Sequence, residues 1–345
     1  MKKITAALLC VMLVISTSVT AFGATKNDVK EKIDTAVAFA FDGNYNKNGY
    51  DVSASKNLYI LAQSGADISA FATDYFKSVS DAAAAGTLTD AGVIGMAVTI
   101  ADLAGADPEN INGTDLTNML KNADPGAVST PYNYFYAIEA AVNHGMKDTA
   151  AAFSNALAKY YVPGTGTDFW NGYGTSPDDL AMFILAMETA GAYTEYTKDA
   201  FEILETFATP DGYSNYGANA DSTALALTAY AAAGNTEKAD EIYDILIKNY
   251  YDPETGGFLA DYDEYYATAD AVFALRFYLP LADDAAPQES TTGNHETTTE
   301  SSSAQQNKDT GTKSPNTGIS VFPAAGAALF ALAAGGLLVK RNKNK

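Results

Sequence analysis

The sequence predicts an all-α domain of about six helical hairpins, with a ring of inner helices wrapped by outer helices. Three observations support this fold class. Apolar segments end in glycine at a steady interval, more polar segments lie between them, and the first helix of each pair is apolar all round. Such a period is typical of helical-hairpin arrays. An open solenoid is the alternative, but the last apolar segment, residues 271–279, lacks the polar cap that an open array needs.

Apolar, alanine-rich segments recur along the chain, and five of them precede a glycine. They are residues 59–62, 93–103, 135–142, 180–187 and 225–233, before Gly65, Gly105, Gly145, Gly191 and Gly234. The intervals between these glycines are 40, 40, 46 and 43 residues, and a sixth segment, residues 267–279, ends at Pro280. Glycine ends helices readily because it adopts the left-handed conformation without a Cβ penalty. We therefore expect an inner helix to end at each glycine.

A more polar amphipathic segment follows each glycine, as in residues 149–160, 197–207 and 237–247. A helix with one polar face belongs on the outside, whereas a helix that is apolar all round must be buried on every side. Residues 28–41 are also amphipathic and supply the remaining outer helix.

The start of the chain has the pattern of a secretory signal peptide, which we place at residues 1–24. Lys2 and Lys3 precede the apolar residues 6–14, and small residues follow. The only cysteine, Cys10, lies in this leader, so we expect the exported chain to have no disulfide and no cysteine-ligated metal. The globular domain is expected at residues 25–285.

The end of the chain has a stalk and an anchor. Residues 286–313 are rich in Ser and Thr and nearly lack large apolar side chains, which predicts a disordered stalk. The final segment, residues 314–345, holds an apolar run at 319–339 and then a basic tip. This run is long enough to cross a bilayer core of about 30 Å as a transmembrane helix, with the basic tip on the cytoplasmic side. The motif before the run reads Ser314-Pro315-Asn316-Thr317-Gly318.

This order of motif, apolar run and basic tip resembles the LPxTG-like cell-wall sorting signal of Gram-positive surface proteins. The resemblance implies that a sortase cuts after Thr317 and joins it to the cell-wall peptide. The protein would then be extracellular and anchored to the wall, with the membrane as its partner before processing. Ser314 stands where that family has Leu, which implies a variant sortase class. A plain C-terminal membrane anchor is the alternative.

The chain is strongly acidic, with 42 acidic and 21 basic side chains. Six of the basic side chains and none of the acidic ones lie in the leader or after Thr317, so the remaining chain has a net charge of −27. Such a surface repels nucleic acid, and we expect no nucleic-acid partner.

One helix start carries a resemblance to a fold family. The segment Asn219-Ala220-Asp221-Ser222-Thr223-Ala224-Leu225-Ala226-Leu227 resembles repeats of the prenyltransferase, terpenoid-cyclase and transcobalamin group. Residues 107–113 and 253–258 resemble inter-helix loops of its bacterial surface members. The resemblance covers most of residues 25–285 and implies an α/α toroid with a central cavity. It does not define an activity, because this fold hosts unrelated chemistries.

The catalytic motifs of that group are not preserved in this chain. Of the acid motif of terpenoid cyclases, only the middle acid remains, as Asp221. Ala267 stands where prenyltransferases have a zinc-binding His, and without Cys in the exported chain both the zinc site and a thioester are excluded. We therefore expect no metal and no cofactor. The binding branch of the group holds a corrinoid, which makes a corrinoid a candidate ligand.

Polar and aromatic side chains mark the starts of the inner helices, and in a toroid these starts would gather around one mouth. Aromatic faces together with carboxylates and amides suit sugars or planar ligands. The candidate ligand-binding residues are Tyr132, Tyr134, Trp170, Asp178, Asp221, Ser222, Tyr265, Tyr266 and Asp270. Asp178, Asp221 and Asp270 are also the candidate catalytic acids.

Helix capping explains some of these residues without any function. The segment before residue 180 has the order of a helix start, with Ser176 as N-cap, Pro177 in the first turn and Asp179 as a first-turn acid, and Thr130-Pro131 has the same beginning. A capping role at the helix start also explains Asp178 and Asp221 without any function. For the tyrosines, packing of the helix walls is favoured over contact with a ligand. Asp270, inside an apolar segment, has no obvious capping role.

Three functions remain open. The first, which we favour, is a non-catalytic wall-anchored module that binds a small ligand or glycan. The second is a glycan hydrolase or lyase that uses paired carboxylates such as Asp178 and Asp221. The third is a structural or adhesive surface protein in which the central cavity is filled core.

Overall fold

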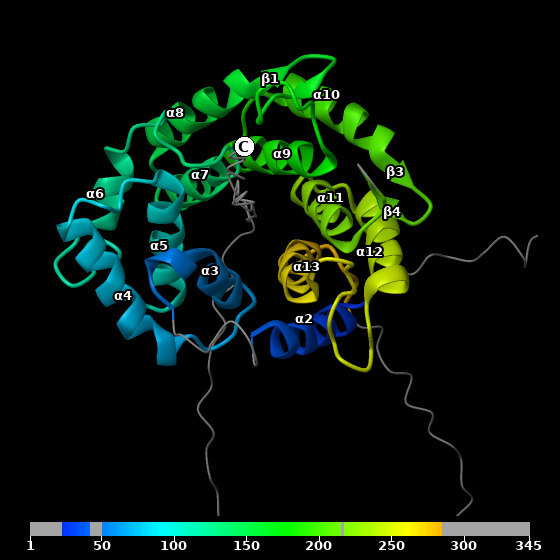
Figure 1. The fold of residues 1–345 in the computed structure, drawn as a ribbon, viewed down its shortest axis with the longest axis horizontal. Helices are drawn as coiled ribbons and strands as arrows, with labels where there is room; N and C mark the ends of the chain where they lie inside the picture. The colour runs from blue at the N-terminus through cyan, green and yellow to red at the C-terminus, as the bar shows by residue number, and fades with distance from the viewer. Residues whose placement is uncertain (1–22, 42–49, 215–216, 285–345) are drawn as a thin grey trace, which may run out of the picture.

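The computed structural model describes residues 23–41, 50–214 and 217–284 and shows an all-α protein, as predicted (Figure 1). The leader up to residue 22, the stalk, the sorting motif and the apolar run at 319–339 lie outside the described residues. Within the described ranges, no helix is long and apolar enough to cross a membrane.

Six inner helices contain the predicted apolar segments to within one residue. They are α3 (Ser55–Gln63), α5 (Ala91–Leu103), α7 (Asn133–Asn143), α9 (Pro177–Ala190), α11 (Ala220–Ala232) and α13 (Glu264–Tyr278). Their burial is nearly all round: in α11, Ala220 and every residue from 222 to 231 are buried. This burial is what their uniformly apolar composition requires.

Six further helices lie outside the inner ones. They are α2 (Lys26–Phe41), α4 (Ser69–Ala84), α6 (Leu116–Lys121), α8 (Lys147–Leu157), α10 (Thr194–Leu204) and α12 (Thr236–Tyr250). Each long outer helix buries only one face. In α12 the buried residues are Ala239, Ile242, Tyr243 and Leu246, at the spacing of one helical stripe.

The predicted glycine positions are confirmed as helix ends. Gly65, Gly105, Gly145, Gly191 and Gly234 all adopt positive φ values, between 61° and 85°, just after α3, α5, α7, α9 and α11. In contrast, the predicted cap at Thr130 is wrong. Helix α7 begins at Asn133, and its N-cap position is Tyr132, which makes no side-chain capping bond. The residues before it form a turn in which Asn133 N donates to the Thr130 carbonyl.

Short segments precede some of the helices. The 3₁₀ turn η1 (Val52–Ala54) leads into α3, while η2 (Ala158–Tyr160) and η3 (Glu205–Phe207) extend α8 and α10. Two antiparallel hairpins follow them, β1 (Tyr161–Val162) with β2 (Gly166–Thr167), and β3 (Ala208–Thr209) with β4 (Gly212–Tyr213). These hairpins, which were not predicted from the sequence, bring the chain back toward α9 and α11.

The inner helices contact one another in chain order. Helix α3 contacts α5, and contacts continue through α7, α9 and α11 to α13, which in turn contacts α3 and α2 (Figure 1). The two ends of the described domain are also joined. Lys26 N donates to the Asp283 carbonyl at 2.8 Å, Asp283 N donates to the Ala24 carbonyl at 3.0 Å, and Lys26 Nζ pairs with Asp284 at 2.7 Å.

Candidate functional site

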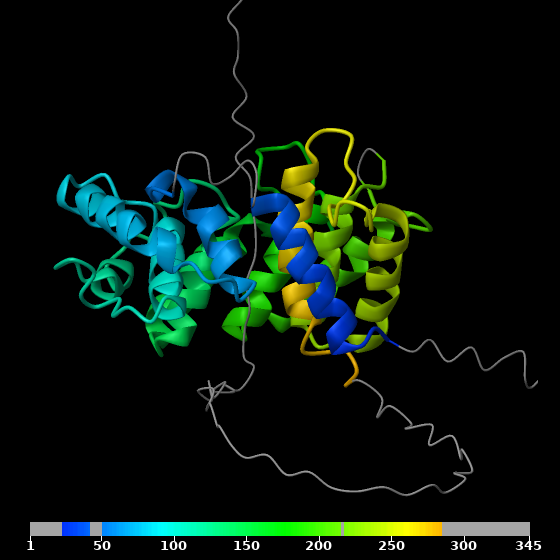
Figure 2. The ribbon, with the colours of Figure 1, turned by 90° about the horizontal axis from the view of Figure 1, so that it is seen from below.

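The starts of the inner helices lie on one side of the molecule. An outer helix separates consecutive inner helices, so the inner helices run in the same direction, and the loop before α13 rises from that side (Figure 2). At this side Asp270 of α13 and Asp221 of α11 face Lys56 of α3, and Asp178 of α9 lies close enough to both acids for their charges to interact. We call Asp178, Asp221 and Asp270 the carboxylate cluster. All three were predicted site residues, and the fold brings them together.

Asp270 forms the floor of the carboxylate cluster. Its side chain is 1% exposed, and neither carboxylate oxygen has a hydrogen-bond partner among the described residues. Lys56 Nζ lies 3.7 Å from Asp270 Oδ1. The Lys56 side chain is 21% exposed, but its Nζ atom is buried, so the exposed part is the aliphatic stem.

Asp178 and Asp221 lie above this floor, at the second helical position of α9 and of α11. Burial raises the pKa of Asp178 to about 6. A hydrogen bond from Ser222 lowers this pKa, and the negative charges of Asp179 and Asp270 raise it further. Burial raises the pKa of Asp221 well above its usual range, and the neighbouring Asp270 adds to this while Lys56 opposes it. The Oδ1 atoms of Asp178 and Asp221 are buried, and neither has a hydrogen-bond partner within the described ranges.

Tyrosines from α13 and the loop before it border the carboxylate cluster. The Tyr266 ring lies 5.0 Å from Lys56 Nζ, in a cation–π arrangement. Burial raises the pKa of Tyr262, and the Asp221, Asp270 and Asp178 charges add to the shift. Tyr265 instead stacks on Phe39 of α2, with ring centroids 5.0 Å apart.

Asp179 is a structural residue, and the capping prediction is confirmed for it. Asp179 N donates to Ser176 Oγ at 3.0 Å and Ser176 N donates to Asp179 Oδ2 at 3.2 Å, which is a capping box. Asp179 Oδ1 also accepts from the Tyr132 hydroxyl at 2.6 Å and from Trp170 Nε1 at 3.0 Å. The predicted residues Tyr132 and Trp170 therefore hold the start of α9.

The predicted residue Tyr134 points elsewhere. Its hydroxyl donates to the Pro125 carbonyl at 2.7 Å, its side chain is buried, and its ring lies against Phe153 of the outer helix α8. It therefore packs the helix wall.

A second buried acid, Glu139 of α7, lies in the middle of an inner helix. It accepts hydrogen bonds from the Tyr59 hydroxyl at 2.7 Å and from Gln63 Nε2 at 3.3 Å. Burial raises the pKa of Glu139 to about 8, against the Tyr59 hydrogen bond. Arg276 of α13 donates through Nε to the Gln63 carbonyl, so this network joins α3, α7 and α13.

Lys56, Tyr262 and Glu139 were not recognised from the sequence, although two of them carry a signal. Lys56 lies three residues before the predicted apolar segment 59–62, whereas the charged residues at the starts of the later inner helices are acids. Glu139 is the one charged residue in the apolar segment 135–142. A charge in such a place is costly unless it has a partner or a function.

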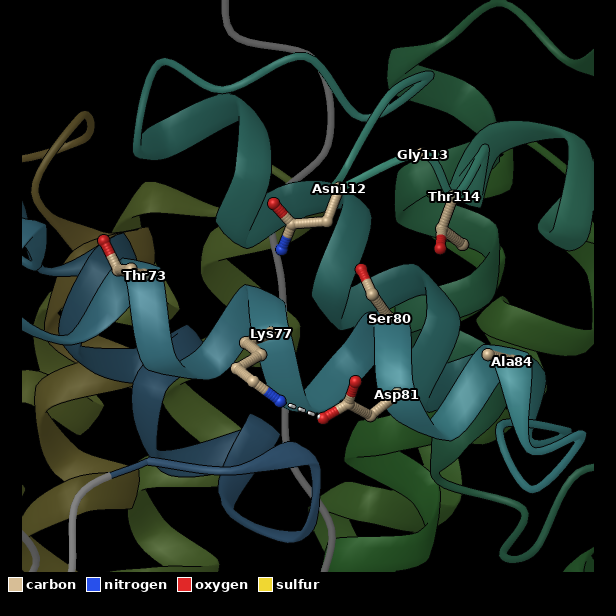
Figure 3. A pocket seen from close by; sticks show the side chains of 8 residues that line it. All are labelled: Thr73, Lys77, Ser80, Asp81, Ala84, Asn112, Gly113 and Thr114. Carbon is tan, nitrogen blue, oxygen red and sulfur yellow. Dashed lines mark hydrogen bonds and ion pairs between the residues drawn. The ribbon is translucent and has the colours of Figure 1, made fainter.

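A groove of about 560 Å³ lies elsewhere, between α4 and residues 112–114 (Figure 3). Most of its lining residues are polar, and Lys77, Asp81 and Ser80 among them are paired within the protein. Lys77 Nζ pairs with Asp81 at 2.5 Å on the exposed face of α4, and Ser80 Oγ donates to the Ile111 carbonyl at 2.8 Å. The groove shares no residue with the carboxylate cluster.

In the part of the chain that the structure describes, no group of three or more His, Cys, Asp or Glu side chains is arranged to hold a metal ion. No family model, no curated protein and no solved structure matches this chain.

Proposed function

We propose that this protein is an exported, wall-anchored α/α toroid that binds a small carbohydrate at the carboxylate cluster. Export and anchoring are inferred from the sequence of residues 1–24 and 314–345. The toroid is inferred from the contacts that α13 makes with α3 and α2 after the chain of contacts through the other inner helices.

The observation that carries the binding proposal is the state of Asp178 and Asp221. Each has a buried Oδ1 atom that no described residue supplies with a hydrogen bond, although both residues as a whole are partly exposed. Buried polar atoms are normally paired, and an unpaired one costs about 1–3 kcal/mol. Two such atoms on neighbouring helices would each gain a hydrogen bond from a ligand whose hydroxyl groups displace the groups that cover them.

Exposed aromatic side chains support a sugar as that ligand. Trp170 is 38% exposed, Tyr173 90% and Tyr262 57%, and all three lie in the loops before α9 and α13, on the side of the carboxylate cluster. Aromatic faces pack on the C–H faces of sugar rings, while carboxyl groups bond the hydroxyls. A solvent-exposed aromatic next to buried acids is therefore the arrangement expected of a glycan-binding surface.

Glycan hydrolysis is the second candidate, favoured by the raised pKa values of two neighbouring acids. A carboxyl that stays protonated near neutral pH can act as a general acid, and a second can act as a base or nucleophile. Asp221 would be the acid and Asp178 its partner. Release of reducing sugar by the wild-type chain, lost in Asp221→Asn, would favour this activity over binding alone.

The test is titration of the purified chain with a panel of neutral, amino-sugar and acidic oligosaccharides. Binding is measured by calorimetry and by the fluorescence of Trp170, the single Trp. Saturable binding to a carbohydrate supports the proposal. Cobalamin in the same panel tests the corrinoid alternative, and a response to cobalamin alone would reject carbohydrate binding. A chain that responds to nothing in the panel would favour a structural role.

A further inference from the structure

The Lys56–Asp270 pair joins the first inner helix to the last. Lys56 is in the first turn of α3, and Asp270 lies in the middle of α13. These helices contact each other where the order of the inner helices returns to its beginning. The pair is therefore a polar contact at the seam between the two ends of the domain, in addition to the hydrogen bond from Arg276 to Gln63.

The geometry of this pair is unusual for a buried ion pair. The 3.7 Å separation is longer than a charge-assisted hydrogen bond of about 2.8 Å, and neither Asp270 oxygen accepts a hydrogen bond from a described residue. A buried ion pair repays its desolvation only with close geometry and further hydrogen bonds. An amide in this place would carry no charge to desolvate.

The surroundings supply what amide formation needs. Burial lowers the pKa of Lys56, with Asp270 and Asp221 opposing the shift, which favours the uncharged amine that can act as a nucleophile. Among the described residues, the groups that face Lys56 include Asp270, Asp221 and the Tyr266 ring, and Asp178 and Tyr262 lie beyond them. Asp221 retains its proton to higher pH than an ordinary Asp, because burial and Asp270 raise its pKa.

We propose that Lys56 and Asp270 form an intramolecular isopeptide bond, which closes the domain covalently between α3 and α13. Lys56 Nζ transfers a proton to an Asp270 carboxylate oxygen, its lone pair then attacks Asp270 Cγ, and a C–N bond forms. Asp221 donates its proton to the departing hydroxyl and takes one from the nitrogen, so that the C–O bond breaks and water leaves. Asp221 ends in its starting state, and no oxidant or other reagent is consumed.

The bond would have two consequences. It removes one positive and one negative charge from the buried floor, so the desolvation cost of both ions disappears. It also closes a loop of more than two hundred residues, which restricts the unfolded chain in the way that a disulfide does in other exported proteins. The inference does not depend on ligand binding, because Asp178, Asp221 and the exposed aromatics remain available to a ligand.

The test is the intact mass of the full chain, purified under denaturing conditions, with peptide mapping after trypsin digestion. The wild-type chain is expected to be lighter than its unlinked sequence by one water, and one branched peptide should contain both Lys56 and Asp270. Lys56→Arg keeps the charge but cannot form the amide, so it should regain the full mass. Asp221→Asn keeps both bonding partners and should be linked at least about tenfold more slowly.

Two outcomes would overturn the proposal. One is a wild-type chain of full, unlinked mass. The other is a water loss that persists in Lys56→Arg, because it would then arise elsewhere, for example from a succinimide at Asp211-Gly212. Linkage in Asp221→Asn at the wild-type rate would remove Asp221 from the reaction. Binding of sugars is measured separately, so failure of either inference leaves the other testable.

Discussion

Tyr59 of α3 donates a hydrogen bond from its hydroxyl to Glu139 of α7 at 2.7 Å, although α5 lies between these helices in chain order. The Tyr59 ring also lies against Tyr136 of α7 and Phe273 of α13, with centroids 5.1 and 6.2 Å apart. Side chains from three inner helices therefore meet at the level of the helix middles. The carboxylate cluster lies at the helix starts, away from Glu139. We expect the carboxylate cluster to bind a ligand and Glu139 to affect stability.

Glu139→Gln should change how stability depends on pH. The pKa of Glu139 is raised to about 8 in the folded chain from an ordinary value of 4.5, so the folded state binds the proton more tightly than the unfolded state. Its contribution is therefore fully present below the unfolded pKa and is lost as pH rises through about 8. Between pH 5 and 8 the free energy of unfolding of the wild type should fall by on the order of 3 kcal/mol more than that of Glu139→Gln.

Urea unfolding at several pH values measures this difference. Gln can still accept the Tyr59 hydrogen bond, so both proteins are expected to have similar stability near pH 5. The other buried acids titrate in both proteins, so the difference between the two curves isolates Glu139. Parallel curves across this range would show that Glu139 is already ionised in the folded protein.

Asp179→Ala should destabilise the domain by about 2–4 kcal/mol, because it removes a capping box and leaves two part-buried donors without their acceptor. Asp179 is 1% exposed, and the donors are Tyr132 and Trp170. Trp170 is the single Trp, so its fluorescence should shift in the folded variant. Asp178→Ala is the matched control one residue away and should cost less, because it removes no capping bond.

Gly95→Ala should destabilise the domain by about 2–4 kcal/mol through overpacking. Gly95 lies where α5 crosses α7, and a Cβ there would overlap the carbonyl of Tyr136, which is backbone and cannot turn aside. Gly105→Ala separates this effect from backbone preference. Gly105 has φ of +69° and no atom within 4 Å of a built Cβ, so the cost should be only about 1 kcal/mol. If chemical denaturation gives the same loss of stability for Gly95→Ala and Gly105→Ala, then α5 and α7 can move apart at little cost in free energy.

Thr317→Ala should move the protein from the wall fraction to the membrane fraction of a host with the matching sortase. The reason is that the proposed cut follows Thr317, and the apolar run at 319–339 would be retained without it. Immunoblots of wall, membrane and medium fractions measure this, with Thr312→Ala in the stalk as the control. A variant that stays in the wall fraction would exclude sortase processing at this motif.

The sequence predicted the helices well because two strong physical signals coincide in them. Segments such as residues 225–233 are apolar all round and can only be buried, and Gly234 then ends the helix at a positive φ. The helix start predicted at Thr130-Pro131 was wrong because this segment has the residues of an N-cap but no helix begins directly after it. The hairpins at β1–β2 and β3–β4 are only a few residues long, too short for a periodic pattern.

The site was predictable in part. Asp178, Asp221 and Asp270 were found because they start or interrupt apolar helices, and the fold gathers them. Asp178 and Asp179 are neighbours at the same helix start, yet only Asp179 forms a capping bond. Which of the two caps the helix depends on the rotation of α9 about its axis. Lys56 was missed because its partner Asp270 is far away in sequence and no local pattern connects them.

Binding by the Asp221→Asn variant tests the central claim most directly. Calorimetry would compare the best-binding oligosaccharide on the wild type, on Asp221→Asn and on Asp81→Asn, a surface acid of α4 outside the carboxylate cluster. We expect at least a tenfold loss of affinity in Asp221→Asn, about 1.4 kcal/mol or more, and unchanged binding in Asp81→Asn. Equal affinity of all three proteins for the sugar would contradict binding at the carboxylate cluster.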